Sequence, residues 1–201
     1  MGVAAVLLTI LLVVFAGASR AGRVDSAIAR AVQDGPHPGR LPYTLLTLGE
    51  PSTVVVLTVA LAVVCLLLRH ASMAAVAVLA SGLTGLLTTV LKPLDGRTFE
   101  GDYSMPSGHT GGVTALALVA GLLLINLSGR RMAAVGAAAL VVAASVGMGL
   151  ALVATNNHYP TDVVGGACCA VLGALGSALL VQGVIELRSP ERTDSPRSPG
   201  P

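Results

Sequence analysis

A short polar stretch, residues 102–110, lies between two long apolar runs and holds the side chains best suited to chemistry. Where a helix should begin, the chain reads Pro106-Ser107-Gly108-His109. Ser107 is a good N-cap residue, and Gly108 permits close approach to the backbone. The free N–H groups and the positive dipole end of such a helix favour an anion, to which His109 could donate a proton. A plain helix start with an incidental histidine is the alternative.

Two cations precede this stretch. Lys92 directly follows an apolar run, and Arg97 comes five residues later, with Pro93 and Gly96 between them to turn the chain. Two cations on one tight loop suit an anion. Ionisable residues at the mouth of a membrane span are costly and are candidates for function. Side chains that snorkel from a span end would explain the same pair.

A second histidine follows two apolar runs later, in the sequence His158-Tyr159-Pro160-Thr161-Asp162. Pro160 suits the first turn of a helix. Asp162 is then placed to accept a hydrogen bond from one ring nitrogen of His158. Such a bond fixes the tautomer and leaves the other nitrogen free as a nucleophile or base. Asp162 could also serve only as a helix cap.

Two kinds of chemistry use these residues. A metal site would take His109, His158 and Asp162 as ligands, although Lys92 and Arg97 nearby would repel a cation. Phosphoryl transfer uses the whole set: cations and helix N–H groups for the charge, an oriented imidazole, and an acid for the leaving group. Since the site opens at the mouth of a membrane bundle, an amphiphilic phosphate ester is the natural substrate.

The composition predicts a membrane protein. Of 201 residues, 54% are hydrophobic and 11% charged, whereas a soluble domain has about 25% charged residues. A net charge of +2 without a basic block gives no sign of a nucleic acid partner. Cys65, Cys168 and Cys169 lie in apolar runs without a CxxC motif, so we expect buried free thiols.

Six apolar segments predict an all-α, polytopic bundle of six transmembrane helices over residues 1–188. The segments are Val3–Ala18, Pro51–Leu68 (or from Thr44), Ala71–Leu91, Thr110–Leu127, Met132–Ala154 and Asp162–Leu187. A helix needs about 20 apolar residues to cross the hydrocarbon core. Frequent Gly and Ala in the last four segments predict closely packed helices. The first segment could instead be a signal peptide, since residues 15–19 resemble a cleavage site, although no Lys or Arg precedes it.

The remaining segments are polar. Within the loop Ser19–Pro42, four apolar residues at helical spacing predict a short amphipathic helix on the membrane surface. These four are Val24, Ile28, Ala31 and Val32. A breaker at residues 34–39 follows, and its His37 receives no role. The tail 189–201 is rich in Pro, Ser and charge, which predicts disorder.

The site loops 92–110 and 155–162 are separated by two predicted spans. Two crossings return the chain to the same face, so the loops share one side of the membrane in either orientation. The Lys and Arg counts on the two sides are nearly balanced. The very short turns at Arg69 and at Arg130–Arg131 favour an inside N-terminus, which puts the site loops outside.

The order and spacing of these motifs resemble the type 2 phosphatidic acid phosphatase family, which includes bacterial lipid phosphatases and undecaprenyl pyrophosphate phosphatases. The family pattern is Lys-x6-Arg-Pro, then Pro-Ser-Gly-His, then Ser-Arg-x5-His-x3-Asp. Lys92, the run Pro106–His109, and His158 with Asp162 match this pattern. The resemblance covers roughly residues 44–187.

The resemblance implies a metal-independent lipid phosphatase without a cofactor, built on six spans, with its site on the extracytoplasmic face of the cell membrane. His158 would form a phosphohistidine, Asp162 would orient it, and His109 would protonate the leaving alkoxide. The implied phosphate ligands are Lys92, Ser107 and the N–H of Gly108. The particular lipid phosphate and the oligomeric state are left undetermined.

Two arginines of the family pattern are absent. Phe99 stands at the first position and Leu152 at the second. Arg97, two residues before Phe99, is a stand-in for the first phosphate ligand, and Asn156 and Asn157 are further candidates. A substrate of lower charge or a weak enzyme would also fit. The absence keeps two other hypotheses open: a catalytically silent lipid-phosphate binder or transporter, and a metal-dependent membrane hydrolase.

Overall fold

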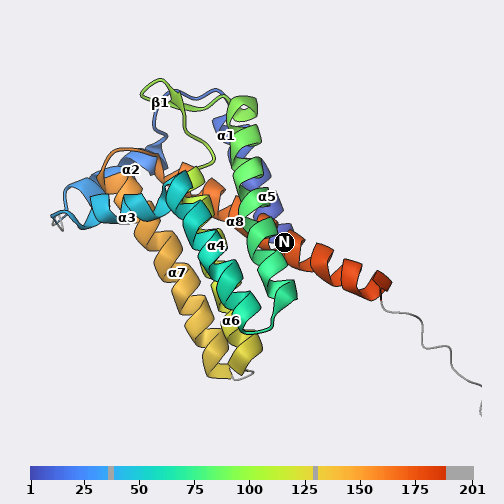
Figure 1. Ribbon diagram of the computed structural model, residues 1–201. Coiled ribbons are helices and arrows are strands. Elements are labelled where there is room, and N and C mark those ends of the chain that lie inside the picture. The colour runs from blue at the N-terminus through green and yellow to red at the C-terminus, as the bar shows by residue number, and fades with distance from the viewer. Residues whose placement is uncertain (36–38, 129–130, 189–201) are drawn as a thin grey trace, which may run out of the picture.

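The computed structural model describes residues 1–35, 39–128 and 131–188, and nearly all of them are helical (Figure 1). The elements are α1 (Gly2–Phe15), α2 (Arg23–Gln33), α3 (Leu41–Gly49), α4 (Pro51–Leu67), α5 (Ala71–Asp95), β1 (Thr98–Phe99), β2 (Asp102–Tyr103), α6 (Gly108–Ser128), α7 (Arg131–Ala154) and α8 (Pro160–Arg188). The all-α class is confirmed, apart from one two-stranded hairpin. His37 and the tail 189–201 lie outside the described residues.

Four helices, α5 to α8, are long and apolar enough to cross a membrane. Helices α3 and α4 pass the same test as a pair, but they are bent by 66° at their junction. Helix α1 is apolar but has only 14 residues, fewer than the roughly 20 that a span needs. The structure therefore has four or five candidate spans, and the predicted six are not confirmed.

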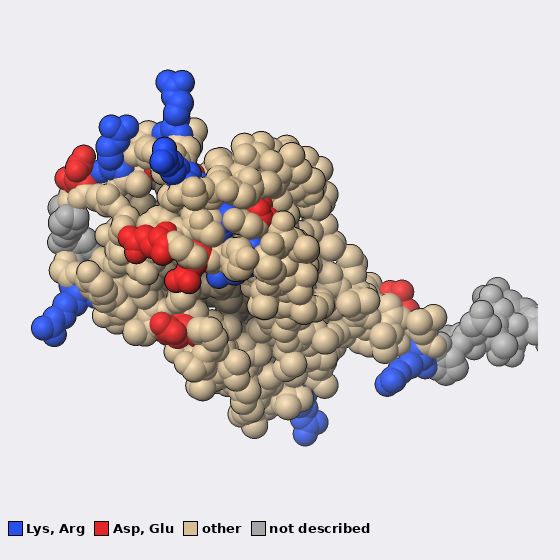
Figure 2. Space-filling view, turned by 90° about the horizontal axis from the view of Figure 1, so that it is seen from above, with Lys and Arg blue, Asp and Glu red and all other residues tan. Residues whose placement is uncertain are grey.

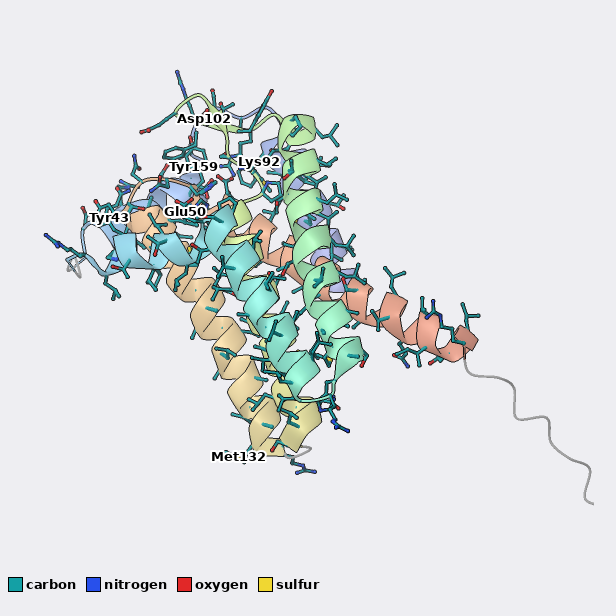
Figure 3. The ribbon with its side chains drawn as sticks, in the orientation of Figure 1. Tyr43, Glu50, Lys92, Asp102, Met132 and Tyr159 are labelled. Atoms are coloured by element: carbon teal, nitrogen blue, oxygen red, sulfur yellow. The ribbon has the colours of Figure 1, made fainter. Side chains whose placement is uncertain are left out.

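The bend between α3 and α4 explains why the sequence left the start of the second segment open. Pro51 restricts the residue before it to an extended conformation, and Glu50 has ψ 136. The helix from Leu41 must therefore stop at Gly49 before another begins at Pro51. The bend leaves Glu50 at the end of the bundle where the site loops lie (Figure 3).

The predicted turn after the third segment lies further along the chain than expected. Helix α5 does not end at Leu91 but continues through Pro93 to Asp95. It stops at Gly96, whose left-handed conformation, with φ 70, is one that glycine adopts without strain. Lys92 is consequently a residue of the last helical turn, and Arg97 follows the turn.

Helix α8 packs against α1, α5 and α6, and its last turns extend beyond the other helices (Figure 1). One core cluster joins α5, α6 and α8 through small side chains, including Ala80, Val119 and Ala174. A second joins α1 to α8 through Leu8 and Cys169. The three cysteines are buried and free, as predicted.

Two glycines let α8 approach its neighbours closely. A Cβ atom at Gly173 would overlap the Thr84 hydroxyl of α5, and one at Gly166 would overlap the carbonyl oxygen of Ser107. Directly before α6, the Ser107 N–H donates a hydrogen bond to the Asp162 carbonyl at 3.0 Å. The glycine spacing therefore holds the start of α6 against the start of α8, which is where both histidine motifs lie.

The predicted amphipathic helix is confirmed as α2. Val24 and Ile28 are 62% and 43% exposed, which fits a helix lying on the membrane surface. Its opposite side holds Asp25, whose side chain is completely buried. A buried carboxylate on a surface helix needs a partner, and that partner lies in the site.

Replacing Gly166 with alanine should destabilise the protein by about 1–3 kcal/mol, because the added methyl group would overlap backbone that cannot move independently. The control is Gly183→Ala on the same helix, where an added methyl group meets no atom within 4 Å. The free energy of unfolding of that variant should be unchanged or higher by up to about 1 kcal/mol, because alanine has a higher helix propensity than glycine. Unfolding of both variants in detergent micelles measures the difference, and equal stabilities would contradict the close approach.

Candidate active site

A pocket of about 260 Å³ opens at the end of the bundle where α5 ends and α6 and α8 begin. It is lined by Lys92, Phe99, Glu100, Asp102, Tyr103, Ser104, His109, Asn156, Asn157 and His158. In Figure 3, Lys92, Asp102 and Tyr159 lie at this end of the molecule, opposite Met132. The predicted meeting of the two site loops is thus confirmed. A larger hollow of about 550 Å³ on α3 holds none of the candidate residues.

His158 projects into this pocket from the turn before α8. Its side chain is 11% exposed, and its Nδ1 lies 3.5 Å from Oδ2 of Asp162, one helical turn further on. Within the described residues Nδ1 makes no hydrogen bond, so the predicted pair is in place but longer than a hydrogen bond. Catalytic hydrogen bonds are often long in unliganded structures. The other ring nitrogen, Nε2, remains available to the pocket.

Asp162 is completely buried and held on both oxygens. Its Oδ1 lies 2.7 Å from Nη1 of Arg97, and its Oδ2 accepts the Tyr159 N–H at 3.2 Å. The carboxylate therefore cannot rotate freely, and Oδ2 stays on the side of His158.

Arg97 lies behind this pair, not on the pocket wall. Its side chain is completely buried, and its Nη2 lies 2.6 Å from Oδ2 of Asp25 on α2. The rings of Phe15 and Tyr159 each lie 4.3 Å from the guanidinium carbon. The predicted stand-in for a phosphate-binding arginine is therefore enclosed by two carboxylates and two rings.

Asp25 is the site residue that the sequence analysis missed. It is buried against Arg97 and accepts hydrogen bonds from the Thr161 N–H at 3.0 Å and hydroxyl at 2.9 Å. A signal was present, since Asp25 follows Val24 within the predicted amphipathic helix. Spacing alone did not show that it turns inward while Val24 and Ile28 face out.

Ser107 caps α6 as predicted, because its Oγ accepts the Thr110 N–H at 3.4 Å. It is completely buried and does not line the pocket. Within the described chain, no hydrogen bond forms at the N–H groups of Gly108 and His109. These two donors remain at the helix end that the sequence predicted as an anion site.

His109 leads from this helix end into the pocket. Its Nε2 lies 3.9 Å from Oε1 of Glu50, and its side chain is 30% exposed. Gly49, the last residue of α3, packs so closely that a Cβ there would lie 2.8 Å from the His109 Cβ. The bend between α3 and α4 therefore fixes the position of His109.

The hairpin β1–β2 forms a further wall that the sequence analysis did not foresee. Its two turn residues, Glu100 and Gly101, have φ 51 and φ 98, as tight two-residue hairpin turns require. It brings the carboxylates of Glu100 and Asp102 to the pocket that holds Lys92. Figure 2 shows acidic side chains beside basic ones at this end of the molecule.

Uncharged side chains stand at the two positions where the family pattern has arginine. Phe99 lines the pocket and packs edge-on against Tyr159, with ring centroids 4.7 Å apart. Leu152 is buried in α7.

Tyr159 keeps its phenolic proton. Burial raises the pKa of Tyr159, and Arg97 opposes this rise. Its hydroxyl donates to the Ser19 carbonyl at 3.5 Å.

The two asparagines line the pocket, but neighbouring residues occupy their amides. Asn156 donates to Glu100 at 3.4 Å and accepts from Gln33 at 3.4 Å. Asn157 donates to the Thr155 hydroxyl at 2.7 Å.

The metal site that the sequence left open would need several ligands close together. The described residues contain no group of three or more His, Cys, Asp or Glu placed to hold an ion.

A sequence model of the PAP2 superfamily matches residues 53–186, two thirds of the chain. The chain belongs to the PAP2 superfamily. Among solved structures, it is similar to a transmembrane PAP2-type phosphatidylglycerolphosphate phosphatase from Bacillus subtilis, with a TM-score of 0.68 and 25% identity. The match covers 93% of this chain and 98% of that one. No curated protein matches the chain.

Family membership and this neighbour identify a membrane lipid phosphatase. The resemblance drawn from the motifs is therefore confirmed. Among the residues that line the pocket, Lys92 is the one lysine or arginine, and Glu100 and Asp102 are acidic.

Replacing Gly49 with alanine should lower phosphatase activity by about ten- to hundredfold, because the methyl group would displace His109 from its position. The matched control is Gly147→Ala on α7, where an added methyl group meets no atom within 4 Å. Phosphate release and thermal unfolding are measured for both. Full activity of Gly49→Ala would show that His109 does not need this position.

Replacing Asp102 with asparagine should lower the inhibition constant of inorganic phosphate by about two- to threefold, since an exposed carboxylate repels the anion only modestly. Asp34→Asn, which removes an exposed acid at the end of α2, is the control. Competition assays at low ionic strength measure the change. An unchanged constant would mean that Asp102 does not face the phosphate.

Proposed function

We propose that this PAP2 protein hydrolyses a lipid-linked phosphate monoester or diphosphate through a phosphohistidine on His158, without a metal ion. The observation that carries the proposal is one pocket wall that holds His158, His109 and Lys92, with Asp162 behind His158. The larger hollow on α3 holds neither histidine.

The reaction proceeds in two displacements. Nε2 of His158 attacks phosphorus, the bond from phosphorus to the leaving oxygen breaks, and His109 gives that oxygen a proton. Water then attacks phosphorus, His109 accepts a proton from the water, and the N–P bond breaks to restore His158. Asp162 stabilises the positive charge that the phosphorylated ring carries while Nδ1 keeps its proton.

The phosphate oxygens are bound by Lys92 and by the free N–H groups of Gly108 and His109. Ser107 contributes by capping the helix that presents those N–H groups, and not by direct contact, since it is buried. Arg97 likewise serves behind the pocket as the anchor of Asp162. These assignments revise the ligand set that the motif pattern implied.

The substrate is a lipid phosphate, because the pocket opens at the end of a bundle whose outer surface is apolar. The structural neighbour is a phosphatidylglycerolphosphate phosphatase, so that lipid is the first to test, followed by phosphatidic acid and polyprenyl phosphates. With one lysine and two carboxylates on the wall, a phosphate of low charge is favoured over a diphosphate.

The protein resides in the cell membrane with its pocket on the extracytoplasmic face. Helix α1 completes six spans by packing along α8 through Leu8 and Cys169, although it is shorter than the rest. The short connection at Arg69 lies at the opposite end of the bundle from the pocket, and the positive-inside tendency places it in the cytoplasm.

A silent lipid-phosphate binder is the second candidate. The two pocket carboxylates and the missing arginines favour it, because both weaken stabilisation of a transition state richer in negative charge. The intact set of His109, His158 and Asp162 favours catalysis, since binding alone has no need of a nucleophile and an acid. Turnover decides between the two.

Purified protein should release phosphate from phosphatidylglycerolphosphate or phosphatidic acid in micelles that contain EDTA. His158→Ala should abolish release, and His109→Ala should lower it by about a hundredfold or more. Phosphate release is measured by a colorimetric assay, with His158→Ala as the blank. Activity retained in His158→Ala would remove the phosphohistidine step. Activity lost in EDTA and restored by zinc would favour a metal-dependent hydrolase.

A further inference from the structure

Asp25 is a buried charge that the proposed reaction does not yet use. It lies on α2, outside the residues 53–186 that match the family, and its side chain is completely buried. Its Oδ2 lies 2.6 Å from Arg97, and its Oδ1 accepts two hydrogen bonds from Thr161. A surface helix thus contributes a fixed negative charge to the back wall of the site.

Arg97 is shared between two carboxylates that face it from different helices. Nη2 binds Asp25 and Nη1 binds Asp162, at 2.6 and 2.7 Å. Rings of Phe15 and Tyr159 contact the guanidinium, so water does not compete for it. Two carboxylates against one guanidinium leave the group with one net negative charge.

That net charge is what the nucleophile needs. The ring of His158 becomes cationic when its Nε2 carries phosphorus and its Nδ1 keeps a proton. Asp162, 3.5 Å from Nδ1, stabilises that cation only if Arg97 does not neutralise it. Charges interact more strongly away from water, so a second carboxylate on Arg97 changes how much of the Asp162 charge His158 experiences.

We propose that Asp25 is a positioning residue for the reaction. By binding Nη2 of Arg97, it leaves Asp162 held by Nη1 while the negative charge of Asp162 still acts on His158. The proposal rests on the phosphohistidine mechanism above. It gives α2 a function beyond membrane contact, because this surface helix completes the electrostatics of the site.

Other charged and titratable groups also surround His158. Those that line the pocket or contact its partner are Lys92 of α5, Glu100 and Asp102 of the hairpin, His109 of α6, and Asp162 and Arg97. None of the first five is altered in the variants below. The buried Asp95 at the end of α5, which also interacts electrostatically with Arg97 and Asp162, is left unaltered as well. A change in the pH–rate profile therefore reports the charge on Asp25 and Arg97.

Asp25→Asn is the first test, since asparagine has the shape of aspartate and can still accept hydrogen bonds from Thr161. We expect kcat to fall by about tenfold, because one charge-assisted interaction is lost in the transition state. KM should stay within about twofold of the wild-type value. The acid limb of the pH–rate profile should move to lower pH, because protonated His158 loses a nearby negative charge. Asp34→Asn, at the exposed cap that follows α2, should leave all three unchanged.

The double variant Asp25→Asn, Arg97→Gln is the second test. It removes one negative and one positive charge, so the group regains the wild-type net charge. We expect the acid limb to return to its wild-type pH, whereas kcat stays low because Asp162 has lost its anchor. A purely structural Asp25 would change the amount of folded protein and would not move this limb in either variant.

Each outcome decides the proposal. An acid limb of Asp25→Asn that coincides with wild type overturns it, as does a double variant whose limb stays displaced. If Asp25→Asn alone fails to fold, the double variant is compared with Arg97→Gln: the proposal predicts that its acid limb lies at lower pH than that of Arg97→Gln, and coinciding limbs overturn it. Loss of the folded state in both, seen by thermal unfolding in micelles, assigns Asp25 a structural role and overturns it. His158→Ala is assayed in parallel: activity in that variant would reject the mechanism itself, whereas an inactive His158→Ala beside an unaltered Asp25→Asn rejects only the positioning role.

Discussion

The buried ion pairs of Arg97 are the interaction on which the site depends. Removing a guanidinium and two carboxylates from water is costly, and each charge must find its partners in the fold. Asp25 supplies one partner from α2, and Asp162 supplies the other from α8. The requirement that all three meet therefore fixes a surface helix, the turn after α5 and the start of α8 relative to one another. The same requirement holds Asp162 beside His158.

Close helix packing is the second constraint. Lipid offers no hydrophobic driving force between helices, so small residues and backbone contacts must supply their association. Gly166 and Gly173 let α8 touch α6 and α5 almost backbone to backbone. This contact, with the hydrogen bond from Ser107 to the Asp162 carbonyl, brings the two histidine motifs into one pocket. Packing deep in the bundle thus sets the geometry at its end.

The pocket combines the family machinery with an altered electrostatic surrounding. Its histidines and Lys92 match the motif pattern that the sequence resembles, but neutral side chains stand at two arginine positions, and the hairpin adds two carboxylates. The one nearby arginine is taken up in holding Asp162. In the proposed reaction, the charge of Arg97 therefore acts on the partner of His158 and not on the substrate.

The helical class, the long apolar segments and the candidate site residues can be read from the sequence alone, because hydrophobic runs and short motifs are local signals. The sequence also placed His109 and His158 on one face, since two crossings return a chain to the same side. It could not show that Arg97 turns away from the pocket or that Asp25 is buried. Those facts depend on which carboxylates a buried guanidinium meets and where a helix is capped. Only the packing of α2, α5 and α8 decides them, because contacts between residues 25, 97 and 162 leave no periodic trace in the chain.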